Sequence, residues 1–159
     1  MKKLNLVIIV FGFSLFFILP FSAHATGPAF NWLDRIGSSS DDVGVATTID
    51  SAGNMYTIGY FSGSPTLDYK LRDGSSGTSG NIMNSAGSHD VFISKFNSSG
   101  IPIWTKDIGG TSDERGMGIA VDGSGNVYIT GYFSGTPDFD PNPAIGQPLF
   151  SNGATDIFV

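Results

Sequence analysis

Short runs of oxygen-bearing side chains are the residues of this chain best suited to chemistry. In one run Asp138, Asp140 and Asn142 stand at alternate positions, the spacing at which calcium-binding loops present oxygen ligands. The glycine that tightens an EF-hand loop and the glutamate that closes it are missing from this run. Two interpretations therefore stay open, a calcium site and a turn capped by its acids, and the partial match favours the turn. Calcium is the one cofactor that the sequence suggests.

Two pairs of acids, Asp41-Asp42 and Asp113-Glu114, resemble the paired carboxylates of acid–base catalysis. Both pairs stand just before a predicted strand, at the same place in an internal repeat. A catalytic centre normally occurs once in a protein built of repeats, whereas a residue that serves the architecture recurs in every repeat. We therefore interpret both pairs as caps of their loops.

Ser88-His89-Asp90 contains the three side chains of a hydrolase triad. Consecutive residues at the start of a strand point to alternate sides, so these three cannot align as a proton relay requires. We predict no catalytic residue in the chain.

Large rings recur in the same way, and they would also suit a platform on which sugars stack. Because they recur, we predict that they form the core between packed sheets, where large rings contribute most. They are Trp32, Tyr60, Phe61, Trp104, Tyr132 and Phe133.

All these recurrences follow one repeat. The stretch from Asp50 to Gly63 (DSAGNMYTIGYFSG) returns 72 residues later, from Asp122 to Gly135 (DGSGNVYITGYFSG), with nine of fourteen positions identical. After Pro137 the second copy is six residues shorter than the first. Such self-similarity indicates an array of one structural unit whose copies cover each other's apolar faces.

Strands must position these residues, because no glycine-free helical periodicity follows Thr26. The turn 50–54 should place a positive φ at Gly53 or Asn54. Neither side of strand 55–61 carries a charge, so sheets should cover both of its faces. Gly59 within it needs a large ring close by, which we expect from the neighbouring sheet. The polar stretch 62–88 is expected to be a surface loop.

The predicted fold class is therefore all-β, built of propeller-type blades with four antiparallel strands each. The predicted strands are 30–36, 43–49, 55–61, 90–96, 101–108, 116–122, 127–133 and 156–159.

The repeat resembles the bacterial β-propeller repeat family called SBBP, whose units carry D-x-x-G-N-x-Y-x-x-G, then G-x-x-D-F, then D-x-F-x-x-K, then a tryptophan strand that ends in Gly-Gly. The matching residues are Asp50, Gly53, Asn54, Tyr56, Gly59, Asp90, Phe92, Lys95 and Trp104, followed by Asp122, Gly125, Asn126, Tyr128, Gly131, Asp138, Phe139, Asp156 and Phe158. The resemblance implies exported, surface-associated proteins and supplies no catalytic residue.

On this basis we expect an incomplete array. It comprises an outer strand of a preceding blade at 26–36, a first repeat at 37–108 and a truncated second repeat at 109–159, after a signal peptide at 1–25. A closed propeller has about 4 to 8 blades, so we expect the rest of the propeller to come from a longer chain.

The start of the chain reads as a secretory signal peptide: Lys2-Lys3, an apolar run from Leu4 to Leu19, and Ala23-His24-Ala25 as a cleavage site. An uncleaved membrane anchor is the competing interpretation. We expect a secreted or cell-surface protein with no membrane span after cleavage. Without cysteine it cannot be a lipoprotein, and its net charge of −6 argues against a nucleic-acid partner.

The function that we expect is a non-catalytic surface scaffold or adhesion module that binds an extracellular glycan or protein. The sequence favours it because it shows no cluster of unrepeated polar residues. The alternative is a propeller-based carbohydrate-active enzyme, a lyase or hydrolase, whose site lies outside this stretch.

Overall fold

The computed structural model of the chain describes residues 31–71, 74–79, 83–140 and 146–159. Their regular structure is all β, with no helix among them, which confirms the predicted fold class. The strands are β1 (Trp32–Gly37), β2 (Asp42–Ile49), β3 (Met55–Phe61), β4 (Thr66–Leu71), β5 (Ser76–Ser79), β6 (Asp90–Phe96), β7 (Pro102–Ile108), β8 (Glu114–Val121), β9 (Val127–Phe133) and β10 (Asp156–Phe158). The predicted signal peptide at 1–25 lies outside the described residues. Within them, no helix is long and apolar enough to span a bilayer.

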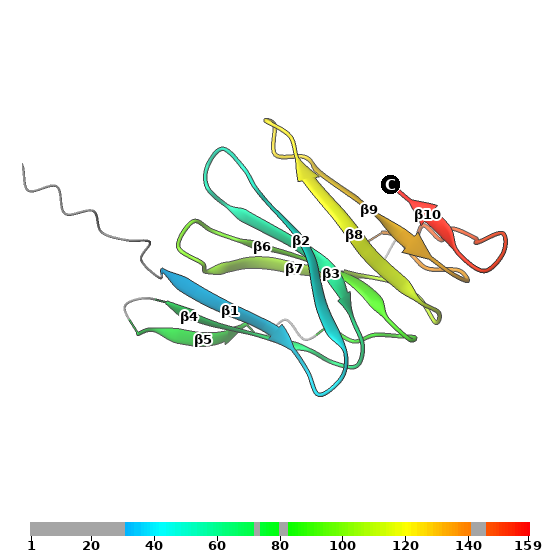
Figure 1. The fold of residues 1–159 in the computed structure, drawn as a ribbon, viewed down its shortest axis with the longest axis horizontal. Helices are drawn as coiled ribbons and strands as arrows, with labels where there is room; N and C mark the ends of the chain where they lie inside the picture. The colour runs from blue at the N-terminus through cyan, green and yellow to red at the C-terminus, as the bar shows by residue number, and fades with distance from the viewer. Residues whose placement is uncertain (1–30, 72–73, 80–82, 141–145) are drawn as a thin grey trace, which may run out of the picture.

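Three antiparallel sheets lie side by side (Figure 1). The middle sheet, which we call the central blade, has the order β2-β3-β6-β7. On one side of it lies the sheet β10-β9-β8, which we call the second blade, and on the other side the sheet β1-β4-β5, which we call the flanking sheet. The central blade therefore has the four antiparallel strands that the repeat predicts.

The turn between β2 and β3 forms as the sequence predicts. The Asp50 carboxylate accepts hydrogen bonds from the backbone N–H groups of Ala52 and Asn54, at 3.0 and 2.9 Å. Gly53 takes a φ of 81°, a conformation that costs glycine little because it has no Cβ. The turn closes an antiparallel hairpin.

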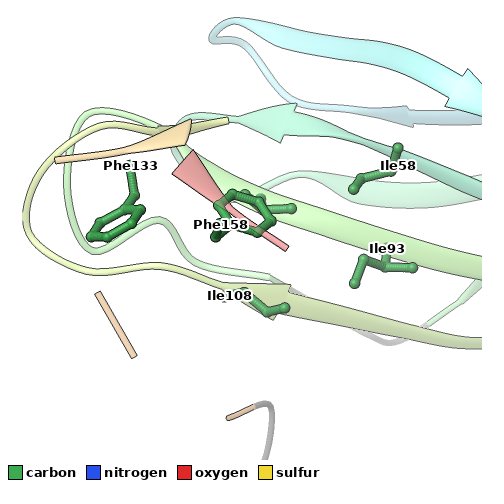
Figure 2. Packing of buried hydrophobic residues seen from close by; sticks show 6 residues of the cluster. Ile58, Ile93, Ile108, Phe133 and Phe158 are labelled. Carbon is green, nitrogen blue, oxygen red and sulfur yellow. The ribbon is translucent and has the colours of Figure 1, made fainter. Parts of the chain in front are cut away.

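Both faces of β3 are covered. Ile58 and Phe61 point to opposite faces, and both are fully buried. Ile58 belongs to a cluster with Phe133 and Phe158 of the second blade (Figure 2). Phe61 packs on the other face, in a cluster that includes Ile36 of β1. The predicted two-sided burial is therefore confirmed.

The ring that covers Gly59 does not come from the neighbouring sheet, so that prediction is wrong. Phe92, on the adjacent strand β6, is the direct cross-strand partner of Gly59. A Cβ on Gly59 would lie 2.7 Å from the Phe92 ring and 1.9 Å from the Val43 carbonyl oxygen. The ring lies flat along its own sheet because glycine leaves the pleat empty, and Phe158 covers Gly131 in the same way.

The stretch predicted as a surface loop, 62–88, contains the strands β4 and β5. β4 pairs antiparallel with β1, and an ion pair between Arg35 and Asp68 joins the two strands. Leu67 is buried in this sheet, with 1% of its surface exposed. The strand β4 was predicted as a loop because only one side of the strand faces the core, so its composition is largely polar. Among the described residues of the second copy, an isolated bridge from Gly109 to Asp138 stands where Gly37 pairs with Thr66 in the first.

Candidate functional site

The richest group of polar side chains lies where the central blade meets the second blade. Two backbone hydrogen bonds join them: Ser88 N–H donates to the carbonyl oxygen of Ser112 at 2.8 Å, and Glu114 N–H donates to that of His89 at 2.9 Å. These bonds hold the start of β6 beside the start of β8. Side chains 24 to 26 residues apart in sequence thereby come into contact.

An ionic cluster occupies this junction. Asp113 contacts His89 Nδ1 through Oδ1 at 2.7 Å and Arg115 Nε through Oδ2 at 3.2 Å. The guanidinium of Arg115 lies 4.6 Å from the centre of the Tyr60 ring, within cation–π range. In the other copy of the repeat, Thr155 replaces His89 and Val43 replaces Arg115. The cluster is therefore unrepeated, which corrects our expectation that the chain has no such cluster.

The Ser88-His89-Asp90 run does not form a relay. Ser88 Oγ lies 3.1 Å from His89 Nδ1, the same ring nitrogen that Asp113 contacts. A triad needs its serine and its acid on the two different ring nitrogens. The carboxylate of Asp90 instead accepts a hydrogen bond from the backbone N–H of Ala86 at 3.2 Å. The arrangement is a histidine that contacts Asp113 across the junction and so links two blades.

Two buried carboxyl groups, which the sequence did not reveal as such, lie at the same junction. Glu114 is fully buried and Asp90 is 4% exposed. Each has one carboxyl oxygen with no hydrogen-bond partner among the described residues. Burial raises the pKa of Glu114 to about 7, helped by the charges of Asp90 and Asp113. Burial likewise raises the pKa of Asp90 to about 6, with the charge of Asp107 adding to it. The one available signal was that Glu114 is the only glutamate.

The second acid of each pair caps its loop, as predicted, whereas Asp113 instead contacts His89 and Arg115. Glu114 Oε2 accepts a hydrogen bond from the backbone N–H of Gly110 at 2.8 Å. In the first copy Asp42 Oδ2 accepts from the backbone N–H of Ser38 at 2.7 Å. Each acid thus closes the loop that precedes its own strand, four residues back.

Asp138 and Asp140 line an acidic cavity of about 280 Å³ beside this junction. Asp138 Oδ1 accepts hydrogen bonds from the backbone N–H groups of Asp140 and Gln147, at 3.0 and 2.7 Å. Its role there is that of a turn cap. Asn142, the third predicted calcium ligand, lies outside the described residues. The other residues that line the cavity are Asn84, Ala86, Asp90, Asp107 and Gly109.

No three His, Cys, Asp or Glu side chains of the described part of the chain are grouped so as to hold a metal ion. Four aspartates therefore share a cavity without forming a preassembled set of ligands. Calcium binding at Asp138, Asp140 and Asn142 stays a prediction.

Two of the six recurring aromatic residues are buried in the core, as predicted, and the other four are half-buried. Phe61 and Phe133 are buried. Trp32 stacks on Phe96 with 6.1 Å between ring centroids, and Trp104 packs against the core cluster that joins the two blades. Tyr60 lies against the His89 ring at 5.3 Å.

The comparison with known protein families points to the same architecture. Residues 103–135 match the family model of the SBBP β-propeller repeat. The matched stretch runs from β7, across the loop between the two blades, to the end of the β8–β9 hairpin. None of the curated proteins matches the chain significantly. Residues 103–135 are thus similar to an SBBP β-propeller repeat, and the four-stranded central blade with the second copy packed on its face is consistent with propeller blades.

Proposed function

We propose that this chain is an exported, non-catalytic scaffold of propeller blades that binds a glycan or a protein outside the cell. One observation carries the proposal: the acids that the sequence offers for chemistry serve the architecture. Asp42, Glu114 and Asp138 each cap a loop, and Asp113 ties two blades together. Surface loops held by such a rigid frame are the usual place for binding.

Export follows from the signal-peptide pattern at residues 1–25. Expression of the full chain in a bacterial host, with cell fractionation and N-terminal sequencing, tests it. The expected product lies outside the cytoplasm and begins at Thr26. A product that stays in the cytoplasm with its leader intact would contradict export.

Binding and catalysis are separated by one set of assays. The full chain is incubated with a panel of bacterial and host polysaccharides, and both retention on the polysaccharide and release of shorter sugars are measured. A scaffold retains a partner without cleaving it, and a variant with His89→Ala binds as the parent chain does. Cleavage by the full chain would contradict the scaffold, and its loss in His89→Ala would place that activity at the junction of the two blades. Retention by a surface protein, with no retention by any polysaccharide, would identify a protein partner.

A further inference from the structure

The acidic cavity beside the blade junction has a counterpart in the first copy of the repeat, and the two places differ in charge. In the first copy Arg35 of β1 lies opposite Asp68 of β4, and its guanidinium forms an ion pair with that carboxylate. The same two positions recur 72 residues later as Asp107 and Asp140. The second copy therefore has the aspartate of this pair, but an acid stands where the first copy has its arginine.

The two places correspond in space as well as in sequence. Gly109 bridges Asp138 in the second copy as Gly37 pairs with Thr66 in the first. Both aspartates of the altered pair line the cavity of about 280 Å³ beside this bridge, together with Asp138 and Asp90. Among the described residues that line the cavity, none is basic. Because like charges close together disfavour one another, a positive group is favoured in this cavity.

Asp90 supplies an independent sign of a ligand. It lines the cavity and is only 4% exposed. Its carboxyl group packs on the backbone of Gly109, where an added Cβ would lie 2.3 Å from Asp90 Cγ. Oδ2 accepts a hydrogen bond from the backbone N–H of Ala86, whereas Oδ1 has no hydrogen-bond partner among the described residues. A buried carboxylate oxygen without a partner costs free energy, and a donor placed in the cavity would offset that cost.

The spacing of these acids favours an organic cation over a metal ion. Calcium takes about 6 to 8 oxygen ligands that converge at 2.3 to 2.6 Å, and no three acids of the described residues are grouped to hold a metal ion. A guanidinium carries five N–H donors in a planar fork and an ammonium carries three. Either group can therefore bridge carboxylates that lie too far apart to share one metal ion, through hydrogen bonds that both charges strengthen.

We propose that this cavity binds the guanidinium or ammonium group of a ligand, with Asp90, Asp107 and Asp140 as acceptors. The bound group takes the place that the guanidinium of Arg35 has in the first copy. It can belong to a basic side chain of a protein or to a small free amine, because both present the same donors. The cavity gives the scaffold a preference for basic partners, and in that respect it rests on the proposed function.

Three probes test the site by thermal melting and by calorimetric titration of the full chain. They are agmatine, which carries a free guanidinium, a short peptide with one central arginine, and the same peptide with citrulline, which has the shape of arginine without its charge. The assay is run at pH 8, above the pKa of about 6 to which burial raises Asp90. Agmatine and the arginine peptide should raise the melting temperature as they bind. The citrulline peptide should bind at least about tenfold more weakly, as the loss of a charge-assisted hydrogen bond predicts.

The sharpest variant gives the second copy the arginine of the first. In Asp107→Arg the guanidinium should fill the cavity from within the chain, which should raise the melting temperature without ligand and abolish agmatine binding. Asp41→Arg is the matched control, because it makes the same change in net charge on an exposed residue outside the cavity. It should bind agmatine as the parent chain does. Asp107→Asn, which adds no bulk, should keep the fold and weaken binding by about tenfold.

The two sources of the group are separated by the same titration. Binding of agmatine alone would identify a small amine as the ligand, and binding of the arginine peptide alone would identify a protein. The proposal would be overturned if neither bound at about 10 mM, well above the millimolar affinity expected of so small a group, or if Asp107→Arg bound agmatine unchanged. A melting temperature that rises with calcium and with neither probe would overturn it as well. Retention of polysaccharides or surface proteins tests the proposed function separately, so either result can fail alone.

Discussion

The two hairpin turns of the repeat are alike bond by bond, although their surroundings differ. Asp50 and Asp122 each accept hydrogen bonds from two backbone N–H groups, from an asparagine side chain and from a tyrosine hydroxyl, at distances that agree within 0.2 Å. The tyrosine of the first turn, Tyr56, is buried, whereas Tyr128 of the second is 55% exposed. The recurring residues therefore determine the hydrogen bonds of the turn, and these bonds are the same whether or not another part of the chain packs against the turn.

The junction between the blades shows the opposite behaviour. His89 and Arg115 have no counterparts in the other copy, and both contact Asp113 across the junction. Repeated residues thus determine the structure of each blade, whereas unrepeated residues make the contacts that are specific to one pair of neighbouring blades. The predictions below test this division.

The largest expected effect comes from Gly59→Ala, which changes a repeated residue. A Cβ there would stand 1.9 Å from the Val43 carbonyl oxygen, a backbone atom that cannot turn away. We expect a loss of about 3 kcal/mol in the free energy of unfolding, at the upper end for overpacking. Chemical denaturation of the full chain measures it.

Gly131→Ala is the repeat partner of this substitution and should also destabilise, since its Cβ would stand 2.1 Å from the Arg115 carbonyl oxygen. Gly123→Ala is the control, because nothing lies within 4 Å of the added carbon. It should change the stability by no more than about 0.5 kcal/mol. Equal losses at Gly59 and Gly123 would show that close packing is not the reason for glycine in the strand.

The second prediction concerns Glu114, which replaces the Asp42 of the first copy at the blade junction. Burial raises its pKa to about 7 from an ordinary value of 4.5. The folded state therefore binds a proton that the unfolded state has lost, and stability falls as the pH rises from about 4.5 to 7. At 1.36 kcal/mol per pKa unit, the loss is on the order of 3 kcal/mol. Glu114→Gln stays neutral and should flatten this part of the stability curve.

Thermal melting at pH 5 and pH 8 provides the measurement. The parent chain should be more stable at pH 5, with Asp90, whose pKa is also raised, adding to the effect. In Glu114→Gln the difference between the two pH values should shrink. A parent chain that is equally stable at both would mean that Glu114 finds a partner for its second oxygen.

Much of this fold could be predicted from the sequence, because its information is local and repeated. The turn at Asp50 follows from a short carboxylate and a glycine within four residues, and the strand after it from an uninterrupted run without charge. The strand β4 was not predicted, because a strand with one polar side resembles a loop in sequence when serine and glycine surround it. Its pairing with β1 depends on a strand more than thirty residues away.

The polar contacts between the two blades were not predicted for a related reason. His89 and Asp113 are 24 residues apart, and only the packing of one blade on another brings them together. The burial of Glu114 could not be predicted either, since its copy Asp42 lies on the half-covered side of the central blade. Contacts within one repeat are visible in the sequence, whereas contacts between repeats require the geometry of the blades.

A smaller effect on stability is expected from Asp50→Ala and Asp122→Ala, each of which removes the hydrogen bonds of one of the two hairpin turns. Both substitutions remove the same hydrogen bonds, but the first leaves the buried Tyr56 hydroxyl without its partner, whereas water can reach that of Tyr128. An unpaired buried hydroxyl costs more than a solvated one. Asp50→Ala should therefore lower the melting temperature by several degrees and Asp122→Ala by less. If Asp122→Ala lowered it as much, burial of the tyrosine would not be what separates the two turns.

The pH dependence of the same turns has a definite sign. A hydrogen bond from Asn54 holds the pKa of Asp50 below its ordinary value, and one from Asn126 does so for Asp122. A lowered pKa gives stability that is present at neutral pH and lost as the pH falls through the folded-state pKa. Acid should therefore diminish the difference between the parent chain and either alanine variant.

The smallest expected effect separates the two interpretations of Asp138, a residue without an acidic counterpart at Thr66 in the first copy. As a cap, it accepts two backbone hydrogen bonds through one oxygen, and asparagine retains such an oxygen. Asp138→Asn should then lower the melting temperature only slightly, by the same amount with and without calcium. Weak extracellular calcium sites have dissociation constants of about 10⁻⁴ to 10⁻³ M, so the titration should extend to about 10 mM. The matched control is Asp68→Asn, which removes a charge paired with Arg35 on the flanking sheet. A melting temperature that rises with calcium in the parent chain and in Asp68→Asn, but not in Asp138→Asn, would contradict the cap and make Asp138 a calcium ligand.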